Sequence, residues 1–209
     1  SASFAADVTG RLTAIPGFCI ATLGPGATNL ATGVGNAWLD RSPMIAITCN
    51  LNTDQLGRRI QMYIDHQQLF APITKASLVL REGTVAETVA EAVRLSLTEP
   101  MGPVHLDLPE DVAVAMATET LPDLTPPVPV KAADDSEIQT ALEILAAAKR
   151  PVAILGTNAM RMRDIDLLRR FVERHGIPFA STTMTKGLID EDHPLSVGCI
   201  ERAKRQIQR

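Results

Sequence analysis

The sequence predicts an α/β fold, with a mainly parallel sheet and flanking helices followed by a second, incomplete Rossmann-like α/β domain. Three observations support this prediction. Short apolar runs alternate with helical patterns along the 209 residues, as in folds built from strand–helix units. Hydrophobic residues make up 45% of the chain, which is enough for a sizeable core. A proline-rich stretch divides the alternating pattern into two regions.

The first region contains short apolar runs typical of buried strands and longer stretches typical of amphipathic helices. Valines at helical spacing within residues 85–97 predict a helix with one apolar face. Asp65 is expected to cap a short helix, and Gly33 and Gly35 are expected to allow close helix packing. Strands are expected at residues 18–21, 44–47, 78–80 and 104–108, and helices at residues 27–39, 67–71 and 85–97, with residues 2–6 inside a further helix.

The sequence changes character after Pro109. Four prolines between residues 122 and 129 fix φ and remove backbone donors, so residues 113–135 are predicted to form an extended linker. This linker separates a domain over residues 1–112 from one over residues 136–209. In the second domain, the sequence predicts a helix at residues 137–149 capped by Ser136, a helix at residues 165–174 ended by Gly176, and strands at residues 151–155 and 177–180.

Composition and charge exclude several classes of protein. The net charge is −4 and 21% of residues are charged, so no basic excess is present to attract nucleic acid or an anionic membrane. Cys19, Cys49 and Cys199 are far apart and lack metal-ligand spacing, so neither a disulfide framework nor a zinc site is expected. The sequence shows no signal peptide and no apolar run of bilayer length. We expect a cytoplasmic protein with reduced thiols.

A turn formed by Gly24, Pro25 and Gly26 connects a candidate strand to a candidate helix, and Asn29 lies in the first helical turn. The glycines let the backbone approach a ligand, and α/β proteins bind ligands at such carboxyl ends of strands. A tight connection without a ligand explains the pattern equally well. The turn is not a Walker loop, because no Lys-Ser/Thr pair follows, and the dinucleotide fingerprint fails at Asn29. The missing fingerprint counts against a Rossmann oxidoreductase.

The turn is the first of several motifs that follow one another along essentially the whole chain. They comprise residues 22–30, Gly33, Ala37, Asp40, Pro43 and residues 45–48, 71–75, 102–112, 186–189 and 192–195. In these motifs the chain resembles the thiamine diphosphate enzymes of the acetolactate synthase, benzaldehyde lyase and glyoxylate carboligase group. The motifs up to residue 112 resemble the pyrimidine-binding domain of that family, and the last two resemble the beginning of its central domain.

The resemblance implies an enzyme that makes or breaks a C–C bond next to a carbonyl, as a carboligase, lyase or 2-oxoacid decarboxylase. It implies a small carbonyl or 2-oxoacid substrate, and a homodimer or homotetramer that holds thiamine diphosphate between subunits. Pro25 and Asn29 match positions that line the pyrimidine pocket, and Gly24 and Gly26 match its wall. The alternative from another class is a non-catalytic assembly or regulatory module that retains the fold.

The resemblance also implies that this chain lacks two parts of the catalytic apparatus. The family's catalytic Glu precedes a helix that ends in an Ala-Asp pair, matched here by Ala6 and Asp7, so the Glu is expected upstream of Ser1. The diphosphate domain that binds Mg²⁺ is expected beyond Arg209. No catalytic or metal-binding residue is therefore expected within these 209 residues, which we expect to be inactive alone.

The substrate side departs from the synthase pattern. Gln61, Met62 and Tyr63 occupy the positions of a Phe-Gln-Glu run in the family's synthases, and Met62 replaces the Gln. This replacement favours a relative with a substrate other than that of acetolactate synthase. His66 could donate a proton near the reacting centre, but a place in the first turn of the helix capped by Asp65 is the favoured interpretation.

FAD is a second cofactor to consider. The turn that begins at Gly156 occupies the place where FAD-containing members have a glycine-rich run, and two of those glycines are replaced here. With one glycine left for close backbone approach, FAD is possible but not the expected cofactor.

Overall fold

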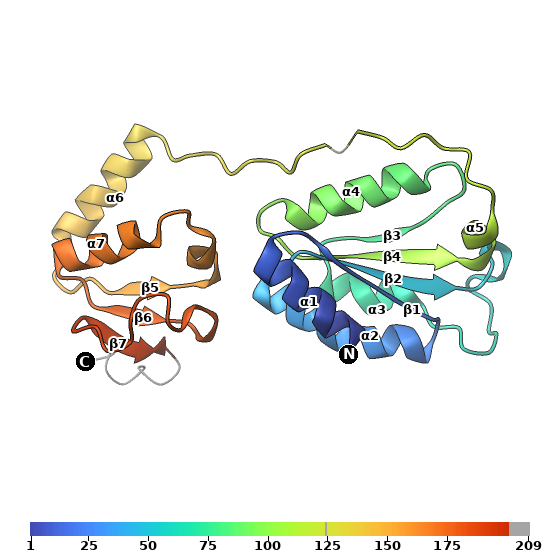
Figure 1. The fold of residues 1–209 in the computed structure, drawn as a ribbon, viewed down its shortest axis with the longest axis horizontal. Helices are drawn as coiled ribbons and strands as arrows, with labels where there is room; N and C mark the ends of the chain where they lie inside the picture. The colour runs from blue at the N-terminus through green and yellow to red at the C-terminus, as the bar shows by residue number, and fades with distance from the viewer. Residues whose placement is uncertain (124, 201–209) are drawn as a thin grey trace. The chain divides into compact units, whose positions relative to one another are not determined.

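A computed structural model describes residues 1–123 and 125–200. The chain divides into two compact units, Ser1–Val130 and Lys131–Arg209. Figure 1 shows helices packed on a sheet in each unit, which confirms the predicted α/β class.

The first unit is built on a four-stranded sheet in which every neighbouring pair of strands is parallel. Its order is β1-β2-β4-β3, with β1 (Gly17–Ala21), β2 (Met44–Asn50), β4 (Pro103–Pro109) and β3 (Ser77–Val79). Each strand overlaps a predicted apolar run. All four carboxyl ends meet at one edge of the sheet, and this edge is where α/β folds bind ligands.

Helices cover both faces of this sheet (Figure 1). Helices α1 (Ala2–Thr13), α2 (Pro25–Asp40) and α3 (His66–Phe70) pack on one face, α4 (Val85–Leu97) packs on the other, and α5 (Glu110–Val114) follows β4. The valine face of α4 packs against Ile45, Val104 and Leu106, as the helical spacing predicts. The short 3-10 helices η1 (Thr53–Gln55) and η2 (Ala71–Ile73) flank α3 in the sequence.

Glycines let α1 approach its neighbours closely. A Cβ at Gly33 of α2 would overlap the Ser3 side chain, which confirms the predicted packing role of this glycine. The same prediction is wrong for Gly35, where the nearest atom to an added Cβ is Ile73 Cγ2 at 3.8 Å. Helix α1 also continues to Thr13, so the expectation that this helix ends at the Ala-Asp pair is wrong. Asp7 lies inside the helix and accepts hydrogen bonds from Arg11 at 2.8 Å and Asn36 at 2.7 Å.

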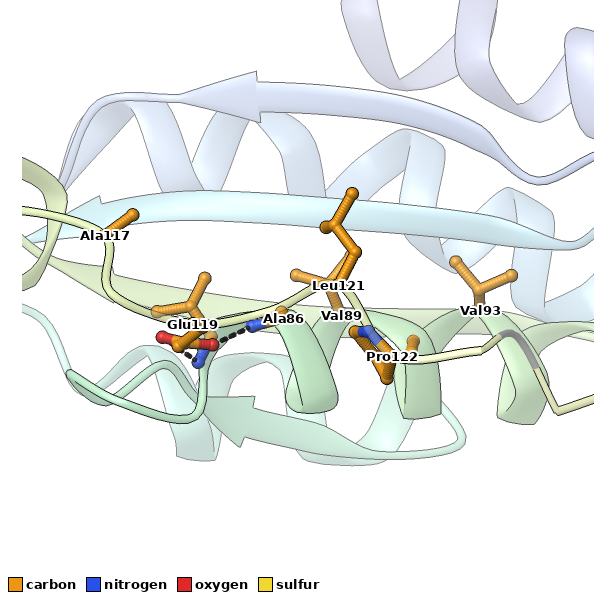
Figure 2. Close-up of a pocket in the computed structure, with 9 residues that line it drawn as sticks. Ala86, Val89, Val93, Ala117, Glu119, Leu121 and Pro122 are labelled. Atoms are coloured by element: carbon orange, nitrogen blue, oxygen red, sulfur yellow. Dashed lines mark hydrogen bonds between the residues drawn. The ribbon is translucent and has the colours of Figure 1, made fainter.

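The first part of the proline-rich segment is fixed to the first unit by Glu119. Its carboxylate accepts hydrogen bonds from the backbone N–H groups of Val85 at 3.0 Å and Ala86 at 2.7 Å, and thereby caps α4. Figure 2 shows Glu119 at the beginning of α4, with Leu121 and Pro122 further along the helix. The space between segment and helix is an apolar groove of about 490 Å³. The segment has no helix or strand at residues 115–123 and 125–134, as its prolines predict.

Replacing Glu119 with alanine should loosen the beginning of α4. Two helix-start amides lose their acceptor, and removal of a capping side chain costs about 1 kcal/mol. Hydrogen exchange at Val85 and Ala86 should accelerate, whereas Asp123→Ala, at an exposed acid of the same segment, should leave it unchanged. Equal exchange in both variants would contradict the cap.

The second unit contains a three-stranded parallel sheet of order β5-β6-β7. Leu155, Val172, Phe179 and Ile189 form its core. The elements in chain order are α6 (Asp135–Ala147), β5 (Ala153–Leu155), η3 (Thr157–Arg161), α7 (Ile165–His175), β6 (Phe179–Ser181), η4 (Thr183–Thr185) and β7 (Ser196–Cys199).

The ends of two helices test the capping predictions. Gly176 ends α7 in the left-handed region with φ 59°, as predicted. The prediction that Ser136 caps α6 is wrong, because Asp134 is the cap. The Asp134 carboxylate accepts from the backbone N–H of Glu137 at 3.0 Å, and the Glu137 carboxylate accepts from the backbone N–H of Asp134 at 2.9 Å. This reciprocal pair satisfies two helix-start donors and starts the helix at Asp135.

Candidate functional site

The glycine turn (residues 24–26) lies at the carboxyl end of β1 and opens α2. Gly24 is the N-cap with φ 62° and ψ −114°, a conformation that favours glycine, and Pro25 begins the helix. A Cβ at Gly24 would lie 2.5 Å from the backbone oxygen of Met62, and one at Gly26 would lie 2.8 Å from Thr22 Cγ2. The close approach that Gly24 permits is therefore an approach to the chain around Met62.

The structure brings together the residues predicted on the cofactor side and on the substrate side. Pro25 and Asn29 are exposed at the beginning of α2. Gln61 and Met62 are exposed and Tyr63 is half-buried in the adjoining loop (residues 58–65). Since the backbone of Met62 contacts Gly24, the two predicted sets form one continuous surface at the carboxyl edge of the sheet.

His66 lies beneath this surface with 1% of its area exposed. It is the first residue of α3, and Asp65 caps that helix by accepting a hydrogen bond from the backbone N–H of Gln68 at 3.0 Å. Both features confirm the favoured interpretation of Asp65 and His66. The His66 ring also has a contact that the sequence does not predict: its Nε2 accepts a hydrogen bond from the backbone N–H of Gly24 at 3.4 Å.

A buried polar network continues from His66 into the sheet and ends at Asp107. Because Gly24 donates to Nε2 of His66, the ring proton is on Nδ1, which donates to Asp107 Oδ1 at 3.0 Å. Asn50 donates to Asp107 Oδ2 at 2.8 Å, and Thr48 donates to Oδ1 at 3.2 Å. Burial tends to raise the pKa of the Asp107 carboxyl, but hydrogen bonds from His66 and Asn50 outweigh burial and hold the pKa below its ordinary value.

His105 extends the network toward β3. The Thr48 hydroxyl, which donates to Asp107, accepts from His105 Nε2 at 2.8 Å, and the Ser77 hydroxyl donates to Nδ1 at 2.6 Å. The ring stacks on Phe70 with centroids 4.2 Å apart. His105 is thus a core histidine with both nitrogens bonded.

The comparisons with known proteins agree with this arrangement. Residues 1–69 match the family model of the thiamine pyrophosphate enzyme N-terminal TPP binding domain, and residues 138–208 match that of the thiamine pyrophosphate enzyme central domain. The chain belongs to the thiamine pyrophosphate enzyme family. The resemblance found in the sequence motifs is therefore confirmed.

Individual relatives of this family are much longer than the chain. A probable acetolactate synthase large subunit of Methanocaldococcus jannaschii is 35% identical over 207 residues, covering 96% of this chain and 35% of the relative. The acetolactate synthase large subunit of Corynebacterium glutamicum is 36% identical, covering 92% and 31%. The acetolactate synthase isozyme 1 large subunit of Escherichia coli is 32% identical, covering 95% and 35%. The chain spans about a third of the length of these relatives.

The surface around the glycine turn combines polar and apolar side chains. Asn29 offers an amide donor and acceptor, and Pro25 and Met62, which lie next to Gly24, are exposed apolar side chains. This combination suits a flat ring with polar edge atoms. In residues 1–123 and 125–200, no group of three or more His, Cys, Asp or Glu side chains could hold a metal ion.

Two further findings concern the described part of the chain. Its three cysteines, Cys19, Cys49 and Cys199, are free thiols. None of its helices combines the length and the apolar character needed to cross a membrane.

Acid should destabilise the first unit in a pH range set by His105. Burial lowers the pKa of this ring from 6.5 to about 4. Between these values the unfolded chain binds more protons than the folded chain, so the free energy of unfolding should fall as the pH falls from 6.5 to about 4. Urea denaturation across this range should show the decrease, and His105→Gln should flatten it. If the free energy of unfolding of His105→Gln falls with pH as steeply as that of the unsubstituted protein, His105 does not cause the decrease.

Asp107 should affect the free energy of unfolding in a separate, more acidic pH range. Its folded pKa is lowered, so its contribution is present above its unfolded pKa of about 3.9 and is lost as the pH falls through the folded value. The two contributions can therefore be separated by their pH ranges.

Proposed function

We propose that the protein containing this chain is a thiamine diphosphate-dependent enzyme that makes or breaks a C–C bond next to a carbonyl, as a carboligase, lyase or 2-oxoacid decarboxylase. One observation carries the proposal. In a chain of this family, the glycine turn opens α2 at the carboxyl edge of a parallel sheet and joins exposed Pro25, Asn29 and Met62 into one surface.

In this proposal, Asn29 would hold the aminopyrimidine through a hydrogen bond, and Pro25 would line the pocket. Gly24 and Gly26, which carry no side chain, shape the wall of the pocket. When bound, the cofactor supplies a nucleophilic carbanion and an electron sink. The residues of this chain bind and orient its pyrimidine ring, whereas the catalytic Glu and the Mg²⁺-binding diphosphate domain belong to other parts of the protein.

The same proposal covers domain organisation and assembly. Residues 1–112 form the pyrimidine-binding domain, residues 113–135 the linker, and residues 136–209 the first part of the central domain. The intact protein is a cytoplasmic homodimer or homotetramer, in which a second subunit completes the cofactor site. We do not assign FAD to the turn after β5, because η3 begins directly after Gly156 and the turn keeps a single glycine.

The substrate is proposed to be a small carbonyl compound or 2-oxoacid. Gln61, Met62 and Tyr63 are the candidates that face it, with Gln61 and Met62 exposed beside the glycine turn. An unbranched thioether at position 62 offers no amide donor, and this favours a less polar substrate group at that place than in a synthase with Gln.

Calorimetric titration of the intact protein with thiamine diphosphate and magnesium tests this proposal. Asn29→Ala removes one or two neutral hydrogen bonds, so the Kd should rise about tenfold, which corresponds to about 1.4 kcal/mol. Leu39→Ala, at an exposed residue near the opposite end of α2, should leave the Kd unchanged. Product analysis with a panel of 2-oxoacids and aldehydes then identifies the reaction.

The outcomes separate the candidate functions. Failure of the intact protein to bind the cofactor would exclude the enzyme and favour the assembly or regulatory module. The 209-residue chain alone should bind the cofactor weakly, because a few neutral hydrogen bonds do not offset an association cost of at least about 4 kcal/mol. Micromolar binding by the chain alone would show that the proposed site is misplaced.

A further inference from the structure

We propose that His66 is a positioning residue: the bond from the Gly24 N–H to its imidazole, held in orientation by Asp107, sets the place of the glycine turn relative to the adjoining loop. The inference rests on the proposed function for its consequence in catalysis. Its structural part, the control of Gly24 by His66, is independent of the cofactor.

Two atoms from one short segment of chain meet Gly24. The backbone oxygen of Met62 lies only 2.5 Å from the place that a Cβ of Gly24 would take, and Nε2 of His66 accepts a hydrogen bond from the Gly24 N–H at 3.4 Å. Met62 limits how far the turn can move toward the loop, and His66 prevents it from moving away. Gly24 is the N-cap of α2, so its position also fixes the first turn of that helix.

The His66 ring has one orientation that satisfies its neighbours. Nδ1 lies 3.0 Å from Asp107 Oδ1 and 3.0 Å from Thr48 Oγ1, while Nε2 faces Gly24. A flipped ring would present carbon atoms to Asp107 and Gly24, so the Gly24 N–H would lose its acceptor and Asp107 would lose the donor that His66 supplies. Because the ring is 1% exposed, water cannot replace these bonds. The carboxylate of a central strand thereby determines the position of a turn at the edge of the sheet.

This connection has a consequence for the proposed site. Pro25 and Asn29 follow Gly24 on α2, whereas Met62 belongs to the adjoining loop. His66 holds both segments, because it accepts from Gly24 and follows the loop directly. Loss of the Gly24 bond should therefore change the spacing between the surface proposed for the pyrimidine and the surface proposed for the substrate.

A pair of variants distinguishes the effects of the two hydrogen bonds of the ring, the one from Gly24 and the one to Asp107. The amide oxygen of Gln at position 66 can reach the place of Nε2 and accept from Gly24, but it gives up the contact of Nδ1. The shorter Asn can donate to Asp107 from the place of Nδ1, but it cannot reach Gly24. His66→Gln should therefore restore the turn and His66→Asn should not. Gln68→Ala, at an exposed position on the same helix, is the matched control.

Two measurements on the intact protein test the inference. The first is hydrogen exchange of the Gly24 amide, with the Thr98 amide, which bonds the Arg94 carbonyl at 3.0 Å at the end of α4, as internal reference. In His66→Asn, the protection of Gly24 should fall about tenfold relative to Thr98, as for the loss of one hydrogen bond. The second measurement is the Kd for thiamine diphosphate, which should rise about tenfold in His66→Asn. In His66→Gln, this Kd should stay within about threefold of that of the unsubstituted protein, and kcat at saturating cofactor should be largely recovered.

Each outcome of these measurements supports or overturns the inference. Preferential loss of Gly24 protection in His66→Asn, with rescue in His66→Gln, supports the inference. Exchange that rises equally at all amides of the first unit would overturn it, because His66 would then support the whole fold and not the turn. Unchanged Gly24 protection in His66→Asn would overturn it as well. A fourth outcome separates the inference from the proposed function. If the unsubstituted protein binds no thiamine diphosphate but His66→Asn still loses Gly24 protection, the proposed function is refuted and the control of Gly24 by His66 stands.

Discussion

Replacing Asp107 with leucine should lower the free energy of unfolding of the first unit by about 3–5 kcal/mol, because several buried donors lose their acceptor at about 1–3 kcal/mol each. The carboxylate is 3% exposed and accepts from Asn50, His66 and Thr48. All three of these donors are oriented toward it. Leucine has the same branching as aspartate but leaves these donors buried without an acceptor, and each unsatisfied group carries its full cost of desolvation.

Asp107→Asn should give a smaller loss, about 1–3 kcal/mol. The amide keeps one acceptor oxygen, which can serve His66. Its nitrogen then faces the Asn50 amide nitrogen, which donates to Oδ2 at 2.8 Å in the structure. Asn50 cannot rotate its amide without cost, because its oxygen accepts from the backbone N–H of Leu51 at 2.9 Å.

Urea denaturation followed by fluorescence measures these losses. The single tryptophan, Trp38, lies in α2 and therefore reports on the first unit. Glu110→Leu, at an exposed acid directly after β4, is the control and should cost much less. An Asp107→Leu variant as stable as the unsubstituted protein would show that the donors find other partners, and would remove Asp107 from the centre of the network.

The elements of the fold could be predicted because their signals are local. The apolar face of α4 follows from valines at helical spacing, and the strands follow from short apolar runs between turn residues. The start of α6 could not be predicted as reliably, because Asp134 and Ser136 are both good capping residues. The side chain of Glu137 decides for Asp134, since it completes the reciprocal pair of hydrogen bonds.

The buried network could not be predicted, because it depends on strand register and on a distant helix. Thr48 lies opposite Asp107 in the pairing of β2 with β4, and His66 reaches this pair from α3. The sequence contains a partial signal: polar residues at alternate positions of both strands, Thr48 and Asn50 in one and His105 and Asp107 in the other. Side chains two apart in a strand share a face, so buried polar residues at this spacing indicate a common network.

The glycine turn shows how a correct pattern can have more than one cause. The sequence indicates that Gly24 permits a close approach, and the structure shows the approaching group to be the backbone of Met62. Nothing local to residues 24–26 announces this contact, because the loop that supplies it lies between two later strands. The positive φ of Met62, 66°, is likewise not indicated by its residue type.

Gly24→Ala should lower the free energy of unfolding and weaken cofactor binding. Its loss of stability has two causes, backbone strain and a close contact, and comparison with Gly57→Ala separates them. Each glycine has positive φ, 62° and 80°, so alanine at either position should cost about 1–3 kcal/mol in backbone strain. An added Cβ at Gly57 meets no atom within 4 Å, whereas at Gly24 it meets a backbone oxygen at 2.5 Å. This contact should add about 1–3 kcal/mol at Gly24, because a backbone atom cannot rotate away as a side chain can. The relief available is a displacement of the loop around Met62, which should also weaken thiamine diphosphate binding by the intact protein. Equal losses of stability in the two variants, measured by urea denaturation, would show that the loop yields freely and that Gly24 is required for its φ alone.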